Sequence, residues 1–153
     1  MSAETNTILL VDDDSLVANS LARLLRRKGY DVSICPDPKA ALIMCEKRTF
    51  DLIITDQRMP VMCGTEFALQ AKQLQPAARV ILISGYSDHK QVIEAFNMDA
   101  INEHVLKPWD NNDLLKVVDE QLQLSFEMFG QEQEKRRENA QKAPSFNRLL
   151  RAG

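Results

Sequence analysis

The sequence predicts an α/β protein built on a parallel sheet with helices on both faces. Short apolar runs rich in β-branched residues recur along the chain, and a longer stretch with apolar residues at helical spacing follows each of them. This order of strand and helix repeats five times, which implies a parallel sheet with right-handed crossovers. The expected architecture is therefore a three-layer α/β sandwich with the strand order 2-1-3-4-5.

In the first half of the chain, recognisable signals mark the ends of the expected elements. The first helix begins after Asp14 or Ser15, which are both good N-caps, and Gly29 ends it. Asp37 and Pro38 supply the N-cap and the first-turn proline of the second helix. The expected elements are strands at 8–11, 32–35 and 51–55, and helices at about 15–28, 38–48 and 65–74.

The second half of the chain continues the same alternation. Pro76 ends the third helix, and the last helix begins near Asp110. Between them we expect a strand at 80–83, a helix at 88–97 and a short strand at 100–106. Together the five repeats form a flavodoxin-like (βα)5 sandwich.

Composition divides the chain into a polar N-terminal tail (1–6), one domain (7–124) and a C-terminal extension (125–153). Residues 131–142 are almost wholly charged or amide, so this segment cannot form a compact core. We interpret the extension either as a solvated helix or linker, or as a connector helix toward a partner subunit or an absent effector domain.

Length, charge and cysteine content exclude several classes of protein. The 153 residues are 44% hydrophobic and 27% charged, which fits one globular domain, and the net charge of −3 gives no basic footprint for nucleic acid. No apolar run approaches the roughly 18 residues of a membrane span, and the polar start lacks a secretory signal. Three cysteines without C-x-x-C spacing disfavour a disulfide framework or a zinc site. We therefore expect a cytoplasmic domain that binds neither membrane nor nucleic acid.

Polar side chains follow four of the predicted strands, at the point where each strand ends. Asp12 and Asp13 follow the first strand, Asp56 the third, Ser84 the fourth and Lys107 the fifth. Ligands of open α/β sheets bind at this carboxyl edge. Three acids, a hydroxyl and a lysine at one edge suit Mg²⁺ and a phosphoryl group.

Each of these side chains can be assigned a chemical role. Asp12, Asp13 and Asp56 offer the carboxylate oxygens that Mg²⁺ prefers, and crowded acids need a cation to offset their repulsion. Asp56 could attack phosphorus to form an acyl phosphate, while Ser84 and Lys107 contact the transferred group. Taken singly, the acids could be helix caps, and Ser84 and Lys107 could be ordinary turn and surface residues; Asp14 is expected to act only as a cap.

The chain resembles the receiver domain of bacterial two-component response regulators over about residues 7–124. The resemblance rests on the acidic pair, on Asp56 in a D-x-x-M-P segment, on Ser84 and on Lys107 in a K-P motif. It implies that Asp56 is the phosphoacceptor for a sensor histidine kinase or phosphotransfer protein, that Ser84 is the switch hydroxyl, and that Mg²⁺ is the cofactor.

The resemblance also implies finer properties of this chain. Arg58 would lend its backbone carbonyl to the metal, and the peptide bond before Pro108 is expected to be cis. Phosphorylation would alter the surface formed by the fourth helix, the fifth strand and the fifth helix, which an effector or a second copy in a homodimer would read. Such a domain catalyses only its own phosphorylation and dephosphorylation.

One position departs from the family pattern, because His104 stands where receivers usually have Tyr or Phe. In the family this aromatic rotates inward on phosphorylation, so His104 is either a switch residue or an outward side chain without a switching role. Tyr86 either shields the acyl phosphate from water or is a simple surface aromatic.

A weaker resemblance concerns the effector. The segments 84–88 and 107–114 look like those of receivers joined to HD-type phosphohydrolases, which are often cyclic-di-GMP phosphodiesterases, although no HD motif occurs in these residues.

Three other functions compete with the interpretation as a receiver domain. A haloacid dehalogenase-type phosphatase would need an acid at position 58, where this chain has Arg58, and the intact site residues argue against a pseudo-receiver that acts only through interactions. A DNA-binding role lacks both a basic surface and a helix-turn-helix.

Overall fold

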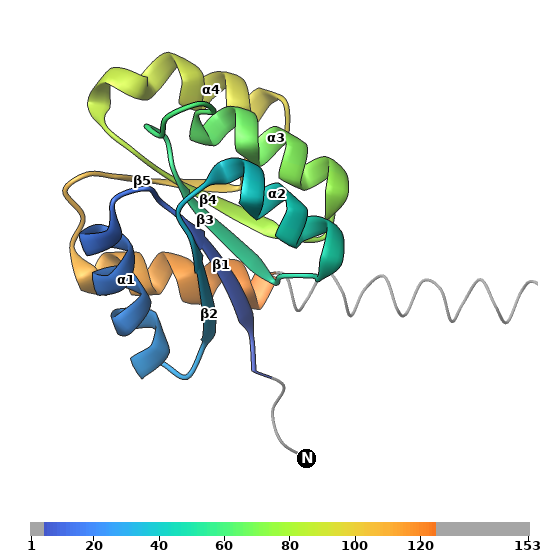
Figure 1. Ribbon diagram of the computed structural model, residues 1–153. Coiled ribbons are helices and arrows are strands. Elements are labelled where there is room, and N and C mark those ends of the chain that lie inside the picture. The colour runs from blue at the N-terminus through green and yellow to red at the C-terminus, as the bar shows by residue number, and fades with distance from the viewer. Residues whose placement is uncertain (1–4, 125–153) are drawn as a thin grey trace, which may run out of the picture.

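A computed structural model describes residues 5–124, which form a five-stranded parallel sheet with helices on both faces (Figure 1). The strand order is β2-β1-β3-β4-β5, which confirms the predicted order 2-1-3-4-5 and the three-layer sandwich. The expected C-terminal extension (125–153) and residues 1–4 of the expected N-terminal tail lie outside the described residues.

The elements follow the predicted alternation of strand and helix. The strands are β1 (Thr7–Val11), β2 (Asp31–Cys35), β3 (Leu52–Asp56), β4 (Arg79–Ser84) and β5 (Glu103–Leu106). The helices are α1 (Ser15–Arg27), α2 (Pro38–Lys47), α3 (Gly64–Leu74), the 3-10 turn η1 (Tyr86–Asp88) and α4 (His89–Asn97). A last helix occupies 111–124, up to the end of the described residues. None of the helices in this described part is long and apolar enough to span a membrane.

Two separate apolar cores hold the helices on the sheet. In Figure 1, α2, α3 and α4 cover one face of the sheet, and α1 and the last helix cover the other. Leu9 and Val11 of β1 belong to the core on the first face, whereas Ile8 and Leu10 belong to the core on the second. This alternation follows from the two-residue period of a strand, and all four side chains are essentially inaccessible to solvent. A sheet buried on both faces fixes the strand ends, and with them the residues that follow the strands.

The register of the strands places their carboxyl ends at one edge of the sheet. Val11 of β1 pairs with Thr55 of β3, so that Asp12 and Asp56 follow at the same level. On the other side of β3, Asp56 itself pairs with Ile83, which immediately precedes Ser84.

The fifth strand is shorter than the predicted segment 100–106, because it begins at Glu103. The reason is that Ala100 closes the turn that follows α4: its N–H donates to the Ala95 carbonyl at 2.9 Å, after Asp99 has turned the chain with φ 57°. Ala100 and Ile101 are buried in the core without being in a strand, which gave the segment its strand-like sequence pattern.

Candidate functional site

The carboxyl edge of the sheet brings together the five polar residues that follow the strands. Asp12 and Asp56 are buried, whereas Asp13 is exposed. One carboxylate oxygen from each of these three acids lies within 4.8 Å of the others. Ser84 and Lys107 line a cavity of about 200 Å³ together with Asp56.

The three clustered carboxylates need a positive charge. Burial raises the pKa of Asp12 to about 6, and the negative charges of Asp56 and Asp13 act in the same direction, although the N–H of Asp14 and the charge of Lys107 oppose them. An acid in this position resists ionisation unless a cation is close. Three hard carboxylate oxygens at this spacing fit a divalent ion such as Mg²⁺.

Asp56 is held in place from two sides. Its Oδ2 accepts a hydrogen bond from the N–H of Arg58 at 3.1 Å, and its Oδ1 lies 2.5 Å from Nζ of Lys107. The contact with Lys107 is an ion pair rather than a regular hydrogen bond, so Oδ1 is buried without a well-oriented donor. The peptide bond between Lys107 and Pro108 is cis, and the Lys107 N–H donates to the Ser84 carbonyl at 2.9 Å.

Ser84 has a hydroxyl group with nothing to bond to in the described part of the chain. Its Oγ is fully buried and has no hydrogen-bond partner there, although an unpaired buried hydroxyl is costly. The cavity beside it would admit a small anion. The cavity is lined by Asp56, Gln57, Arg58, Ser84, Gly85, Ser87, Asp88 and Lys107. A hydroxyl and an ammonium facing one buried carboxylate are suited to holding a tetrahedral oxyanion on that carboxylate.

Gly64 and Gln57 support the site, although the sequence interpretation gave neither a role in it. A Cβ atom at Gly64 would lie 2.2 Å from the backbone carbonyl oxygen of Asp56, so only glycine fits there. The buried Gln57 accepts a hydrogen bond from the Thr65 N–H at 2.8 Å, which ties the strand end to the start of α3. The D-x-x-M-P segment followed by Gly64 was the only sequence signal for this close approach.

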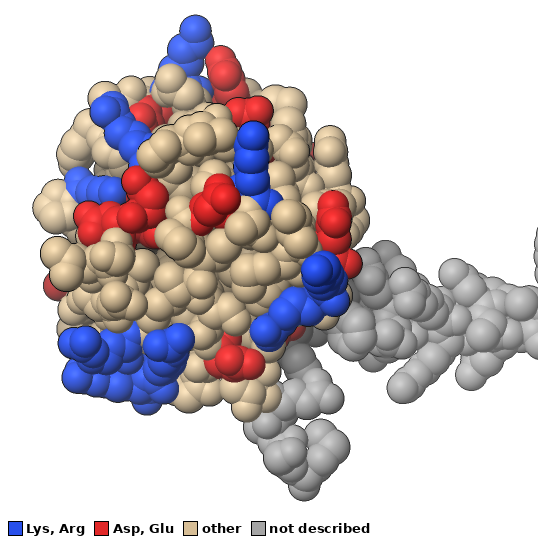
Figure 2. Space-filling view, in the orientation of Figure 1, with Lys and Arg blue, Asp and Glu red and all other residues tan. Residues whose placement is uncertain are grey.

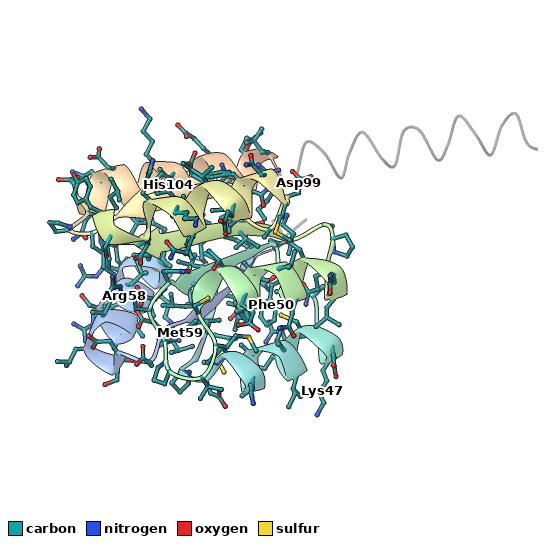
Figure 3. The ribbon with its side chains drawn as sticks, turned by 90° about the horizontal axis from the view of Figure 1, so that it is seen from above. Lys47, Phe50, Arg58, Met59, Asp99 and His104 are labelled. Carbon is teal, nitrogen blue, oxygen red and sulfur yellow. The ribbon has the colours of Figure 1, made fainter. Side chains whose placement is uncertain are left out.

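The sequence interpretation also missed a contact between two loops. The Arg58 side chain forms an ion pair with Asp88, at 3.4 Å between Nε and Oδ1, and donates a hydrogen bond to Oγ of Ser87. Figure 3 shows Arg58 at the edge of the molecule away from Lys47 and Asp99, which lie near the C-terminal ends of α2 and α4. Arg58 had been considered only for its backbone carbonyl.

Asp14, Tyr86 and His104 are not among the residues that line the cavity. Asp14 caps α1, since its Oδ1 accepts hydrogen bonds from the N–H groups of Leu16 and Val17. His104, labelled in Figure 3, is half-buried. Its ring packs edge-on against Phe96 of α4, with 5.9 Å between the ring centroids. Tyr86 is 79% exposed, so its ring does not cover the cavity in this conformation.

A basic surface lies on the C-terminal half of α1. Arg23, Arg26 and Arg27 line a shallow hollow with Asn19, and Figure 2 shows the basic side chains gathered over this helix. Arg26 and Arg27 lie in the last turn of α1, where positive charges suit the negative end of the helix dipole. Asp14 begins α1 at the carboxyl edge of the sheet, whereas Arg26 at the other end of the helix donates to the carbonyl of Val32 near the start of β2. The basic surface therefore lies toward the amino edge of the sheet, away from the site.

The chain is similar to known proteins in both sequence and structure. Transcriptional regulatory protein ZraR of Escherichia coli O157:H7 is 33% identical over 122 residues, which cover 80% of this chain and 27% of ZraR. The crystal structure of a CheY-like response regulator receiver domain protein from Methanospirillum hungatei is 29% identical, with a TM-score of 0.78 over 82% of this chain and 99% of that one. The signal receiver domain of an HD domain-containing protein from Pseudomonas fluorescens is 28% identical, with a TM-score of 0.79 over 85% and 96% of the two chains.

These similarities concern one domain rather than whole proteins. The chain spans only about a quarter to just over a third of the length of the first curated relatives that it matches. The family model described as the response regulator receiver domain matches residues 8–119, which contain all five polar residues at the strand ends. The fold, the site and this match agree, and the chain belongs to the family of response regulator receiver domains of two-component signalling.

Proposed function

We propose that this domain accepts a phosphoryl group on Asp56. The supporting observation is the buried Asp56 carboxylate, which lies between the Lys107 ammonium and the acidic pair and beside the unpaired Ser84 hydroxyl. An Asp56 oxygen attacks phosphorus, and the bond from phosphorus to the donor breaks with its electron pair on the leaving group. The donor is the phosphohistidine of a sensor histidine kinase or phosphotransfer protein, whose imidazole is that leaving group.

Each neighbouring side chain has a defined task in this reaction. Asp12, Asp13, Asp56 and the backbone carbonyl of Arg58 would hold Mg²⁺. When bound, the ion offsets the charge on the transferring oxygens. Lys107 contributes a second positive charge beside the acceptor, and Ser84 supplies a hydrogen-bond donor to the new phosphoryl oxygens once its loop moves toward them.

The phosphorylated form would favour a different position of the Ser84 loop and of the surface formed by α4, β5 and the last helix. A domain of this kind biases an equilibrium between two conformations, and a partner reads the one that phosphorylation stabilises. His104 lies within this surface and contacts α4 through Phe96, so its rotation would couple β5 to that helix. The reader of this surface would be an effector or a second copy of the domain.

The effector lies outside the described residues. Relatives differ in this respect: ZraR is named as a transcriptional regulator, whereas another similar receiver comes from an HD domain-containing protein. The HD-type phosphodiesterase effector and the cytoplasmic location remain predictions from the sequence.

The test is the intact mass of the protein after incubation with Mg²⁺ and acetyl phosphate. We expect a gain of one phosphoryl group in the wild type and in Asp31→Asn, an exposed acid at the opposite edge of the sheet, and no gain in Asp56→Asn. Covalent labelling that persists in Asp56→Asn would refute the assignment of Asp56 as the acceptor. Folded wild-type protein that is not labelled would instead support a pseudo-receiver that acts through its surface alone.

A further inference from the structure

Arg58 and Asp88 connect the two loops on either side of the cavity. Arg58 follows the acceptor strand by two residues, and Asp88 lies at the end of η1, after Ser84 and Gly85. The Asp88 carboxylate binds on both of its oxygens: Oδ1 pairs with the Arg58 side chain at 3.4 Å, and Oδ2 accepts the Gly85 N–H at 3.1 Å. One carboxylate therefore links the residue after Ser84 to the residue that contacts Asp56.

We propose that this contact, the Arg58–Asp88 clasp, holds Ser84 in its unphosphorylated position, and that Arg58 exchanges Asp88 for the phosphoryl group on Asp56. The inference rests on the proposed phosphorylation of Asp56. It assigns a regulatory role to the Arg58 side chain, beyond that of its backbone carbonyl, and a positioning role to Asp88.

Geometry allows Arg58 to make this exchange. Its N–H already bonds to Oδ2 of Asp56, its side chain lines the same cavity, and 71% of that side chain is exposed. A guanidinium group binds a phosphate in a bidentate manner, with shorter and stronger hydrogen bonds than a neutral donor makes. A phosphoryl group on Asp56 also carries more negative charge than the single carboxylate of Asp88.

The loss of Arg58 would destabilise the turn that holds Ser84. The Asp88 side chain is only 8% exposed, so its carboxylate has little water to replace the guanidinium. A buried charge without its cation is unfavourable, and the turn over 85–88 would loosen. Ser84, which precedes this turn and whose hydroxyl has no partner in the described chain, would then be free to move toward the phosphoryl group.

A double-mutant cycle on labelling by acetyl phosphate tests the clasp. Asp88→Asn keeps an amide oxygen for the Gly85 N–H but removes the charge that holds Arg58. We expect it to raise the steady-state ratio of phosphorylated to unphosphorylated protein about threefold. The corresponding free-energy change is in the range that a partly exposed ion pair contributes. In an Arg58→Met background, the same substitution should leave the ratio unchanged, because there is no guanidinium to release.

The matched control is the Arg48–Asp31 ion pair, which is also partly exposed and lies at the amino edge of β2. Arg48→Met and Asp31→Asn should show no coupling in labelling. Equal effects of Asp88→Asn in both Arg58 backgrounds, or no effect in either, would refute the clasp while leaving the acceptor intact. An unlabelled wild type would refute the proposed phosphorylation, and the clasp with it.

The Gly85 amide gives a second readout that does not depend on labelling yield. The chain has five glycines, so a ¹⁵N-glycine NMR spectrum is simple, and Gly85→Ala identifies the resonance. Arg58 does not bond to Gly85 directly. In Arg58→Met that has not been phosphorylated, the Gly85 resonance should move toward its position in the phosphorylated wild type. A resonance that stays in place would contradict the clasp.

Discussion

Lys107 Nζ lies 2.5 Å from Asp56 Oδ1, although Asp56 ends β3 and Lys107 follows β5, which are not neighbours in the sheet. The strand between them is β4, and the Lys107 N–H donates to the carbonyl of Ser84 at its end. The lysine therefore contacts Asp56 with its side chain and Ser84 with its backbone. A change of charge on Asp56 can reach Ser84 through this one residue.

Lys107→Ala should separate phosphorylation from its conformational consequence. The substitution removes the ammonium beside Asp56 but keeps the backbone N–H that bonds to Ser84. We expect intact-mass measurements to show labelling by acetyl phosphate, at a reduced rate because one electrostatic contact is lost. The Gly85 amide resonance, in contrast, should move less than in the wild type when the variant is labelled, because only the Arg58–Asp88 clasp then connects Asp56 to the Ser84 loop.

The exposed Lys116 of the last helix provides the control, since Lys116→Ala should be labelled and should shift Gly85 as the wild type does. A labelled Lys107→Ala protein with the full wild-type shift at Gly85 would show that Lys107 does not carry the signal to the loop.

The position of the site could be predicted from the sequence because it depends only on strand ends. Buried parallel strands are readable from their apolar runs, and their carboxyl ends must meet at one edge of the sheet. This is sufficient to place Asp12, Asp56 and Lys107 near one another. It also gave the strand order, since five strand–helix repeats with right-handed crossovers allow few alternatives.

Contacts between loops could not be predicted in this way. The Arg58–Asp88 ion pair and the close approach of Gly64 to Asp56 depend on loop conformation, for which hydrophobic periodicity gives no signal. Val61 illustrates the difficulty: it has φ 73°, a left-handed conformation that β-branched residues rarely adopt. The early start assigned to β5 has a related cause, since Ala100 and Ile101 are apolar for reasons of packing alone.

Gly64→Ala should disable the acceptor, whereas Gly85→Ala should not. A Cβ at Gly64 would lie 2.2 Å from the Asp56 carbonyl oxygen, so the backbone of β3 or α3 must move. We expect a loss of about 3 kcal/mol in the free energy of unfolding, at the upper end of the cost of overpacking, and a strong loss of labelling. At Gly85 the nearest atom to a Cβ is Asp88 Oδ2 at 4.0 Å, which is ordinary contact.

Urea unfolding and intact mass, measured on both glycine variants, compare these two effects. Wild-type stability in Gly64→Ala would show that the junction of β3 and α3 relaxes at little cost. A loss of labelling in Gly85→Ala equal to that in Gly64→Ala would show that labelling does not report the position of Asp56.

Asp12→Asn should have opposite effects on stability with and without Mg²⁺. At neutral pH the buried Asp12 carboxylate is unfavourable, as its raised pKa indicates, and a neutral amide can still accept the Asp14 N–H. Without metal, the variant should therefore melt at a higher temperature than the wild type. Added Mg²⁺ should raise the melting temperature of the wild type, because an ion that binds only the folded state stabilises it.

This Mg²⁺-dependent increase should be much smaller in Asp12→Asn and unchanged in Asp31→Asn. The measurement is thermal unfolding followed by circular dichroism in EDTA and in a Mg²⁺ series. Equal Mg²⁺-dependent increases in the melting temperature of the wild type and of Asp12→Asn would show that Asp12 does not bind the ion.

Lys72→Met should stabilise the protein at neutral pH but not at high pH. Burial in α3 lowers the pKa of Lys72 to about 8 from its ordinary value of 10.5, and the charge of Arg79 acts in the same direction, while Asp99 opposes it. Between pH 8 and 10.5 the unfolded chain binds the proton more tightly, so the free energy of unfolding of the wild type rises with pH in this interval. Below pH 8 the folded state holds a partly buried ammonium at a cost.

Replacing Lys72 by methionine should add roughly 1 kcal/mol to the free energy of unfolding at pH 7, after allowance for solvent screening, and almost nothing at pH 10.5. Urea unfolding at the two pH values measures the difference, with Lys72→Arg as the control that keeps the positive charge. A gain of the same size at both pH values would assign the effect to packing of the methionine side chain, because only the charge of Lys72 changes with pH.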